Sequence, residues 1–459
     1  TATIDTPITG AGGLDKQDGG VLALNGVNTY AGGTTISGGA LRVNSDAALG
    51  AADGNISLAG GVLSIGGTAF NSTDRAIALG NAGGGIEVVD AANTFTVDDN
   101  LTGSGAFTKQ GAGTLVLTGT NSYTGGTSVA GGTLAGNTNS LKAAIGTQTG
   151  TTVRFVQAQD GQFAGTLSGA GGVRKDGLGT LQLTGNQPIS GGVDLREGSL
   201  LLGDGTTGAT LGSTVTIAAG AVLLGGGSVT GIDNAGTISA ASAPGLNFTV
   251  SGNYVSQPGS ALNVSLRDSN MAPITVTGTA NLAGSLQAAN GFVYNGGNAY
   301  PILRAGAVNG TFDSVNLPNL AFFTSSLAYS SDSVTLALQR NATSIPDAGE
   351  TPNQGSTGEA ISTMPAGSDL YEHIMGQSAD TVAEALKQLS GDSHAGLSSA
   401  LVRNSASARD IPLRHLQSCM RGDRYASGQA GVNRPYDAGN CDTAAWAEII
   451  GNWQRQDGN

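Results

Sequence analysis

Three copies of one glycine-rich segment constrain the fold of this chain more than any other feature of its sequence. The copies begin at Ile8, Leu101 and Leu167 and align without a gap. Leu101 follows Ile8 by 93 positions, and Leu167 follows Leu101 by 66. Several glycines and one lysine recur at the same positions in all three copies. Repetition of this kind is typical of solenoid proteins, in which stacked units share one continuous core.

Apolar residues recur at three positions of the segment, and we predict that they form the core. They are Leu14, Phe107 and Val173 at the first position, Leu22, Leu115 and Leu181 at the second, and Leu24, Leu117 and Leu183 at the third. Residues two apart lie on one face of a strand, so the second and third positions point the same way. The recurring lysines are Lys16, Lys109 and Lys175, and the sequence assigns them no role.

Glycine pairs punctuate each copy and set the length of its strands. Gly125 and Gly126, for example, can end one strand and begin a turn, since glycine adopts positive φ at little cost. Strands of about 4 to 6 residues cannot bury a face alone, but stacked units can. We therefore predict an all-β fold, a right-handed parallel β-helix (solenoid). If the copies are whole turns apart, a turn holds about 22 to 23 residues, and residues 1–340 form about 14 to 16 turns over roughly 70 Å.

The composition excludes several classes of protein. Charged residues make up 12% of the chain, against about 25% in most proteins, and threonine, serine and asparagine take their place. A net charge of −13 argues against nucleic acid or an anionic membrane as a partner. No apolar run is long enough to predict a membrane helix. Because Thr1 lies within repeat-like sequence, we expect the chain to be a fragment whose amino-terminal neighbour is missing.

Changes in composition divide the chain into five predicted regions. Residues 1–230 carry the repeats and are expected to form a β-helical stalk. Residues 231–340 are richer in aromatic residues and predict a capping β region with a denser core. Residues 341–368 contain three prolines and no apolar periodicity, which predicts a flexible linker. Helical spacing then predicts short helices within residues 369–417, and residues 418–459 end in a stretch that alternates like one β-strand.

These stretches together resemble the bacterial autotransporters of type V secretion. "GAGTLVLTGTNSYTGGTSVAGGTL" is similar to their passenger-associated transport repeat. "AGTISAASAPGLNFTVSGNY" and "YPILRAGAVNGTFDSV" are similar to the autochaperone region of such passengers. "LKQLSGDSHAGLSSALVRNSASARDIPLRHL" resembles the helical linker that threads the outer-membrane barrel, and "AWAEIIGNWQRQDGN" resembles the start of the first barrel strand. The order of the stretches is the order found in the family.

The resemblance implies a surface-exposed stalk that assists its own export and displays an effector attached to its amino-terminal side. The barrel of the family, which would continue beyond Asn459, implies the outer membrane and its assembly machinery as partners, with the passenger outside the cell. A host-cell surface is a further expected partner. Two alternatives stay open: the β-helix is itself an adhesin for host or neighbouring cells, or the chain is the C-terminal part of a subtilisin-like protease autotransporter. A carbohydrate-active β-helix enzyme is the least favoured interpretation.

The sequence predicts no catalytic residue, no metal site and no cofactor. A β-helix enzyme that cleaves polysaccharides needs clustered acidic groups, and the mid-rod offers only Asp90, Asp98 and Asp99, which we interpret as a solvated loop. The three histidines are evenly spaced, but glycines and a proline interrupt any helix that could join them as metal ligands. These residues are His373, His394 and His415.

Two short features near the C-terminal end remain as candidates. Cys419 and Cys441 could form a disulfide closing a loop of about 23 residues, and two free thiols are the alternative. The tripeptide Arg421, Gly422 and Asp423 matches the integrin-binding motif, for which a chance match is the favoured interpretation and an adhesion site the alternative.

Overall fold

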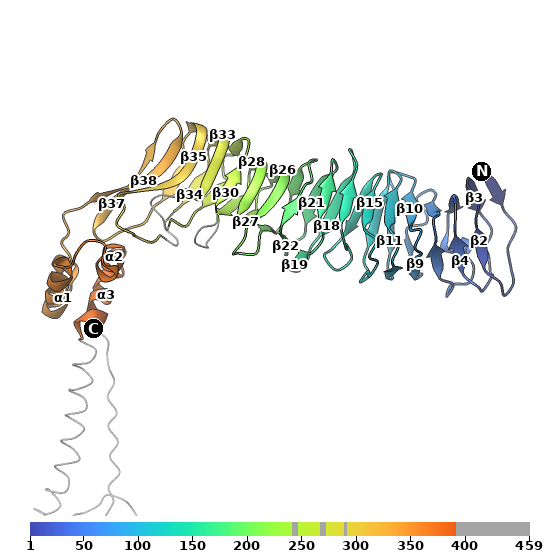
Figure 1. Cartoon of the computed structure of the whole chain (residues 1–459), viewed down its shortest axis with the longest axis horizontal. Coiled ribbons are helices and arrows are strands. Elements are labelled where there is room, and N and C mark those ends of the chain that lie inside the picture. The colour runs from blue at the N-terminus through green and yellow to red at the C-terminus, as the bar shows by residue number, and fades with distance from the viewer. Residues whose placement is uncertain (241–246, 267–271, 289–291, 392–459) are drawn as a thin grey trace, which may run out of the picture.

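The computed structural model describes residues 1–240, 247–266, 272–288 and 292–391. A long rod of short strands runs from the N-terminal end to Arg340, and three short helices follow it (Figure 1). The rod is a parallel β-solenoid of about 13 turns, which confirms the predicted all-β solenoid. The predicted number of 14 to 16 turns is too high, because turns lengthen towards the C-terminal end. Leu115 pairs with Leu134, whereas Ile274 pairs with Leu303, a partner much further along the chain.

Four sheets form the walls of the solenoid. Two of them lie mainly in the N-terminal half. The nine-stranded sheet contains β1 (Ala2–Ile4), β3 (Val21–Leu24), β5 (Ala40–Val43), β7 (Val62–Ile65), β10 (Gly84–Val88), β13 (Phe107–Gln110), β15 (Thr127–Val129), β17 (Ile145–Thr147) and β20 (Leu167–Gly169). The five-stranded sheet contains β2 (Leu14–Lys16), β4 (Thr34–Ile36), β6 (Ile56–Leu58), β9 (Ile77–Leu79) and β12 (Leu101–Gly103).

The other two sheets continue the rod to its C-terminal end. The sixteen-stranded sheet contains β8 (Ser72–Thr73), β11 (Thr94–Val97), β14 (Thr114–Leu117), β16 (Thr133–Gly136), β18 (Thr152–Val156), β21 (Gly172–Asp176), β23 (Asn186–Gln187), β24 (Val193–Leu195), β26 (Ala209–Ile217), β28 (Gly227–Asn234), β30 (Phe248–Val250), β31 (Tyr254–Ser256), β33 (Ile274–Leu282), β35 (Ala299–Gly310), β37 (Phe323–Tyr329) and β38 (Ser333–Arg340). The eight-stranded sheet contains β19 (Gly161–Phe163), β22 (Thr180–Leu183), β25 (Ser199–Leu202), β27 (Val222–Gly225), β29 (Thr237–Ala240), β32 (Ala261–Asn263), β34 (Ser285–Gln287) and β36 (Ser314–Asn316). Strand β28 crosses the expected boundary at residue 230, so the solenoid continues through it.

Alternation along each strand places every second side chain in one shared core. Strand β14 shows the pattern, because Leu115 and Leu117 are buried while Thr114 and Val116 are half-buried on the outer face. Buried apolar residues of this kind form one cluster that runs through the whole rod. Each turn therefore covers the apolar row of the turn before it, which is how strands of three or four residues become stable.

An antiparallel hairpin ends the sixteen-stranded sheet. Strand β38 pairs with β35 on one side and with β37 on the other, and both pairings are antiparallel. The other pairings between the described strands are parallel, so the hairpin breaks the stacking pattern (Figure 1). A further parallel turn cannot continue from this end in the same way.

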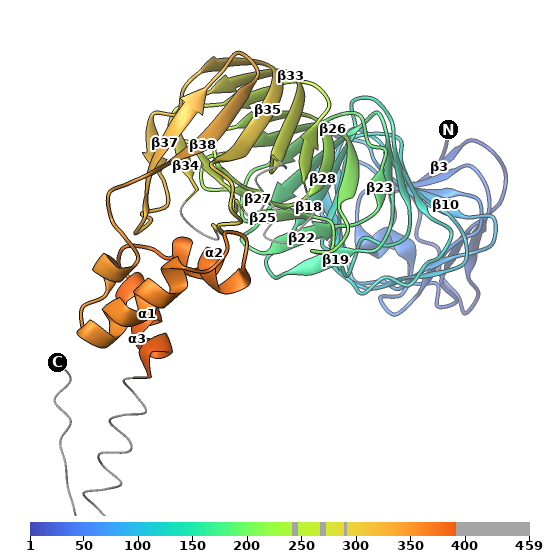
Figure 2. The ribbon, with the colours of Figure 1, turned by 60° about the vertical axis from the view of Figure 1, so that its left-hand side comes forward.

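Three α-helices pack together beside the hairpin (Figure 2): α1 (Pro352–Ser362), α2 (Asp369–Met375) and α3 (Val382–Ser390). Contrary to the prediction of a flexible linker, residues 341–368 contain α1 and a 3₁₀ turn, Pro346–Ala348. Thr351 and Gln354 form a capping box that starts α1, with Pro352 as its first residue. Helices α2 and α3 lie in the region where short helices are predicted, and a bridge between Leu320 and Ser378 joins them to the rod.

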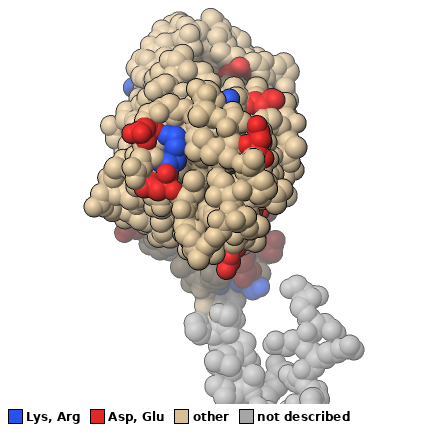
Figure 3. Space-filling view, turned by 90° about the vertical axis from the view of Figure 1, so that its right-hand side faces the viewer, with Lys and Arg blue, Asp and Glu red and all other residues tan. Residues whose placement is uncertain are grey.

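Charged side chains are sparse on the end of the rod formed by the first turns. Figure 3 looks at this end and shows small separate groups of acidic and basic residues on a largely uncharged surface. Within the described part of the chain, no helix is both long and apolar enough to cross a membrane.

Candidate functional site

Each copy of the repeated segment folds into two layers that stack on each other. In the first copy β2 pairs with β4 and β3 pairs with β5. The second copy repeats this arrangement with β13 on β15 and β14 on β16, and the third with β21 on β24 and β22 on β25. One copy is therefore a self-stacking unit, longer than a single turn, whose second layer pairs with its own first layer.

The register within the unit is the same in all three copies. The first predicted core position pairs with the residue 20 positions later, as Phe107 does with Thr127. The second pairs with the residue 19 positions later, as Leu115 does with Leu134. A turn inside the repeat is therefore shorter than the turn inferred from the sequence.

That inference fails because successive copies do not begin on the same sheet. Leu14 lies in the five-stranded sheet, Phe107 in the nine-stranded sheet and Val173 in the sixteen-stranded sheet. The copies are consequently not separated by whole numbers of turns, which is the assumption behind the inferred turn length. Equivalent residues of different copies point in different directions from the axis of the rod.

The predicted core residues all face the interior, but to different extents. Seven of the nine are at most 2% exposed, namely Leu24, Phe107, Leu115, Leu117, Val173, Leu181 and Leu183. Leu14 and Leu22 are only half-buried. Both lie at the N-terminal end of the rod, where β2 is the end strand of its sheet and only the short β1 covers β3.

The recurring lysine is buried and binds backbone carbonyls of both layers. The side chain of Lys109 is fully buried, and its Nζ donates to the carbonyl oxygens of Gln110, Gly111 and Gly131 at 2.8, 2.9 and 3.0 Å. Gln110 and Gly111 lie at the corner between β13 and β14 in the first layer, and Gly131 lies at the corner between β15 and β16 in the second. The ammonium group therefore holds the two layers together at one corner.

The same contact occurs in the other copies. Lys175 Nζ donates to Asp176 O, Gly177 O and Glu197 O at 3.2, 2.6 and 3.0 Å. Lys16 Nζ donates to Asp18 O and to Gly38 O. We refer to Lys16, Lys109 and Lys175 with their carbonyl partners as the lysine clamps. Sequence alignment of the copies shows the recurring lysine, but only the structure shows that it points inward.

Burial makes the charged form of these lysines less favourable. It lowers the pKa of Lys109 to about 8, although the carboxylate of Glu87 opposes this shift. Burial also lowers the pKa of Lys175, against the charges of Asp176, Glu197 and Asp160. The carbonyl oxygens satisfy the ammonium hydrogens but only partly replace the hydration of the charge.

One side-chain amide in each copy joins neighbouring turns of the rod. Asn121 Oδ1 accepts from Leu101 N at 2.7 Å, and its Nδ2 donates to Ser140 O at 2.6 Å. Asn28 makes the same pair of bonds with Ile8 N and Ala48 O. Gln187 takes this position in the third copy, and its Oε1 accepts from Leu167 N at 2.6 Å. The alignment contains this signal too, since an amide recurs at all three positions.

A buried tyrosine and threonine are exchanged together for apolar residues in the third copy. Tyr123 Oη lies 2.7 Å from Thr127 Oγ1, and the equivalent Tyr30 and Thr34 are 2.6 Å apart. The corresponding residues of the third copy are Ile189 and Val193. The paired exchange is physically consistent, because either hydroxyl alone would lose its partner in the core.

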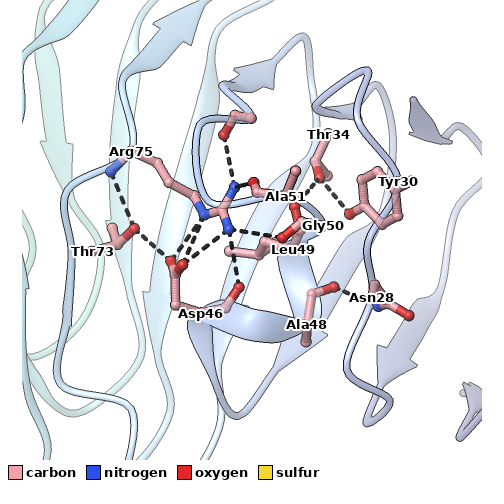
Figure 4. A network of polar contacts seen from close by, with 11 residues as sticks. Asn28, Tyr30, Thr34, Asp46, Ala48, Leu49, Gly50, Ala51, Thr73 and Arg75 are labelled. Carbon is pink, nitrogen blue, oxygen red and sulfur yellow. Dashed lines mark hydrogen bonds and ion pairs between the residues drawn. The ribbon is translucent and has the colours of Figure 1, made fainter. Parts of the chain in front are cut away.

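The loop that follows the first copy is held by a buried ion pair. Arg75 donates to the carboxylate of Asp46 through Nε at 2.9 Å and Nη2 at 2.9 Å (Figure 4). It also donates to backbone carbonyls of the loop, including Ala51 O at 2.6 Å and Gly54 O at 2.8 Å. The Arg75 side chain is 1% exposed, so its donors fix this loop rather than meet a ligand. No repeated residue marks Arg75 in the sequence.

The described residues bring together no group of three or more histidine, cysteine, aspartate or glutamate residues suited to a metal ion. Asp90 and Asp99 accept hydrogen bonds from nearby backbone amides, and Asp98 accepts one from Thr118. His373 lies in α2 near Gln377. The remaining predicted residues lie outside the described part of the chain: His394, His415, Cys419, Cys441, Arg421, Gly422 and Asp423.

The two-layered units coincide with a known repeat family. The passenger-associated-transport-repeat matches residues 14–43, 107–135 and 173–202, which are the self-stacking copies described above. This chain is part of an autotransporter passenger that carries these repeats. In each copy, the residues that match the repeat family include both layers and the lysine clamp.

Relatives of this passenger share parts of its length. The adhesin BmaC autotransporter of Brucella suis is 35% identical over 45% of the chain, but the match covers 6% of that protein. An extracellular serine protease of Serratia marcescens is 26% identical over 65% of the chain and 32% of the protease. The uncharacterized protein YuaQ of Escherichia coli is 39% identical over 25% of the chain and 8% of that protein. The chain thus spans less than a third of each of these relatives.

Proposed function

We propose that this chain is the stalk of an autotransporter passenger, which assists its own export and displays an effector attached to its amino-terminal side. The observation that carries the proposal is the self-stacking of each repeat. The second layer of a copy pairs with a first layer that lies close by in the sequence, as Leu134 does with Leu115. Closing so short a loop has a small entropic cost, so each layer can form as soon as its partner is in place.

The C-terminal part of the rod is suited to start this process. Phe292 packs against Tyr300 at 5.0 Å, and Tyr294 against Phe323 at 5.0 Å, measured between ring centroids. The Arg340 guanidinium lies over the ring of Phe322 at 5.1 Å. Aromatic pairs add stabilisation beyond their buried area. These contacts support an autochaperone role for residues 231–340.

Folding from this end would give export a direction. A chain that emerges with its C-terminal end first would fold the region near the hairpin, and each later turn would pair with a preformed edge. Burial of each turn outside the membrane would oppose backward movement of the chain, without nucleotide hydrolysis. The similarity to autotransporters supports secretion to the outer membrane or cell surface, with a barrel and the outer-membrane assembly machinery as partners.

Refolding of the full chain and of a variant without residues 231–340 tests the proposal. We expect the variant to refold at least tenfold more slowly and its repeats to be cut by protease under conditions that leave the full chain intact. A control variant lacking β4 to β6 removes N-terminal turns and is expected to refold at the rate of the full chain. Equal refolding rates for all three proteins would contradict the autochaperone role.

The structure and the relatives suggest one second candidate, that of an adhesin. The observation in its favour is the 35% identity to a protein named as an adhesin. Binding of the purified chain to epithelial cells would support this role, and binding equal to that of an unrelated β-solenoid would exclude it. We propose that the chain itself is not an enzyme, since its match to the serine protease covers only 32% of that protein. Incubation with peptide and ester substrates tests this statement, and turnover by the chain would refute it.

A further inference from the structure

A groove of about 530 Å³ lies on the outer face of the sixteen-stranded sheet. Three glycines, Gly172, Gly191 and Gly192, contribute backbone to its lining. A row of hydroxyl groups lies on one side, because Thr114, Thr133 and Thr152 occupy successive turns in register. On the other side lie three arginines, Arg154, Arg174 and Arg196.

The arginines lie close together because of the sheet register. Arg154 pairs directly with Arg174 on the next turn, about 4.8 Å away along the axis. Arg174 pairs in turn with Asp194. Two guanidinium groups stacked on adjacent turns would repel each other, and one carboxylate between them offsets the repulsion: Asp176 accepts from Nε of Arg154 at 2.5 Å and from Nε of Arg174 at 2.9 Å.

Each of these guanidinium groups keeps its terminal nitrogens available. Arg154 and Arg174 use Nε for Asp176, and Arg196 uses Nε for Asp194 at 2.6 Å. Their terminal nitrogens donate to no acceptor among the described residues. The three side chains are 39%, 35% and 52% exposed. Arg75 is the opposite case, because its side chain is 1% exposed and its terminal nitrogens bind loop carbonyls.

We propose that this groove binds an acidic polysaccharide, whose anionic groups pair with the terminal nitrogens of Arg154, Arg174 and Arg196. The sugar hydroxyls would bond to the threonine row and to Asp194. This inference goes beyond the stalk function and does not depend on it. The distance between turns is comparable with the length of one sugar residue, so successive sugars can meet successive turns.

Other ligand classes fit the groove less well. Nucleic acid fits less well, because the carboxylate of Asp194 lies in the lining and no aromatic ring offers a surface for base stacking. A peptide strand cannot add here, because the strands beneath the groove already pair on both sides. No aromatic ring lines the groove, so a neutral glycan would lack a stacking surface. Charge-assisted bonds to spaced anionic groups remain the strongest contacts on offer.

Binding of oligogalacturonate to the full chain, measured by calorimetry at low salt, tests the proposal. We expect saturable binding that weakens as salt is added and that is lost with the neutral methyl ester of the same oligosaccharide. A sulfated heparin-derived oligosaccharide forms a second arm, and the tighter of the two identifies the anionic group. Arg174→Gln is expected to weaken binding about tenfold, which is the loss of one charge-assisted hydrogen bond.

Two further variants keep the test decisive. Arg196→Gln removes a side chain that binds only the exposed Asp194, so the fold should survive, and we expect a similar loss of affinity. Arg42→Gln is the matched control, because Arg42 is also a half-buried outer arginine bonded through Nε, to Ser64, but lies outside the groove. The proposal would be overturned if both groove variants kept their affinity or if the methyl ester bound. It would also be overturned if an oligoglutamate peptide bound equally tightly or if neither acidic oligosaccharide bound.

Discussion

The repeat-bearing turns and the C-terminal turns of the same rod are stabilised in different ways. In the repeats, short turns are joined at their corners by buried polar groups such as Lys109 and Asn121. In residues 231–340 the turns are longer, as the pairing of Ile274 with Leu303 shows, no recurring lysine joins them, and an antiparallel hairpin ends the stack. Regular turns can therefore be added one after another, whereas the hairpin closes the C-terminal end of the stack.

The largest predicted effect concerns a glycine at the corner of a repeat. Gly132 has a φ of +59°, and a Cβ there would lie 2.3 Å from the carbonyl oxygen of Gly113 in the turn below. We expect Gly132→Ala to lower the free energy of unfolding by about 4 kcal/mol, because the added methyl both strains the backbone and separates the layers.

Gly259 is the matched control in the C-terminal turns. Its φ is +84°, but a Cβ there would meet nothing within 4 Å. We expect Gly259→Ala to cost about 1 kcal/mol, from backbone strain alone. Denaturant unfolding of both variants measures the difference, and equal costs would show that close stacking of layers does not require Gly132.

The second prediction removes a lysine clamp. Lys109→Met keeps most of the buried stem but leaves three carbonyl oxygens without their donor, so we expect a loss of about 2 kcal/mol. Removal of a buried charge offsets part of the cost. Lys142, which is half-buried and makes one bond of 3.4 Å, is the control, and Lys142→Met should change the stability by less than about 0.5 kcal/mol.

The third prediction follows from the pKa of the same lysine. The folded pKa of Lys109 is about 8, below the ordinary value of 10.5. Between these values the unfolded chain binds more protons than the folded chain, so raising the pH stabilises the fold, and below pH 8 this contribution is constant.

We therefore expect the stability difference between the natural chain and Lys109→Met to grow from pH 8 to pH 10 by up to about 1 kcal/mol per pH unit. Taking the difference removes the opposing contribution of buried tyrosines at high pH. Unfolding in urea at several pH values provides the measurement. A stability difference that does not change with pH would show that the ammonium group is hydrated in the folded chain.

The smallest predicted effect uses the third copy as a guide. Tyr123→Phe leaves the buried hydroxyl of Thr127 without a partner and should cost about 1 kcal/mol. The double variant Tyr123→Phe and Thr127→Val imitates the apolar Ile189 and Val193 and should recover most of this loss. If the double variant loses more unfolding free energy than the two single variants lose together, the two hydroxyls do not act as one unit.

The sequence predicts the fold of the rod well, because alternation and glycine spacing are local signals. Leu115 and Leu117 are two apart and must share a face whatever the turn length, and both are buried. The length of a turn is not local in this sense. Alignment gives the separation of the copies but not the sheet on which each copy starts, so the assumption of whole turns makes the predicted turns of the repeats too long.

The sequence does not predict contacts between turns for the same reason. Arg154 and Arg174 are distant in the sequence, and only a turn of matching length brings them side by side. Helix α1 was hidden for a different reason, since its one strongly buried apolar residue, Ile361, gives no periodic pattern. Its capping box at Thr351 and Gln354 is a local signal from which the helix could have been predicted.

The starting sheet of each copy has a consequence for how such rods change length. A duplicated segment that does not span a whole number of turns is rotated about the axis of the rod relative to the copy before it. Each new copy therefore presents its loops in a new direction. Lengthening by this route spreads the same surface around the circumference instead of lining it up along one side. A rod grown in this way offers a partner similar loops from several sides, each set at a different height.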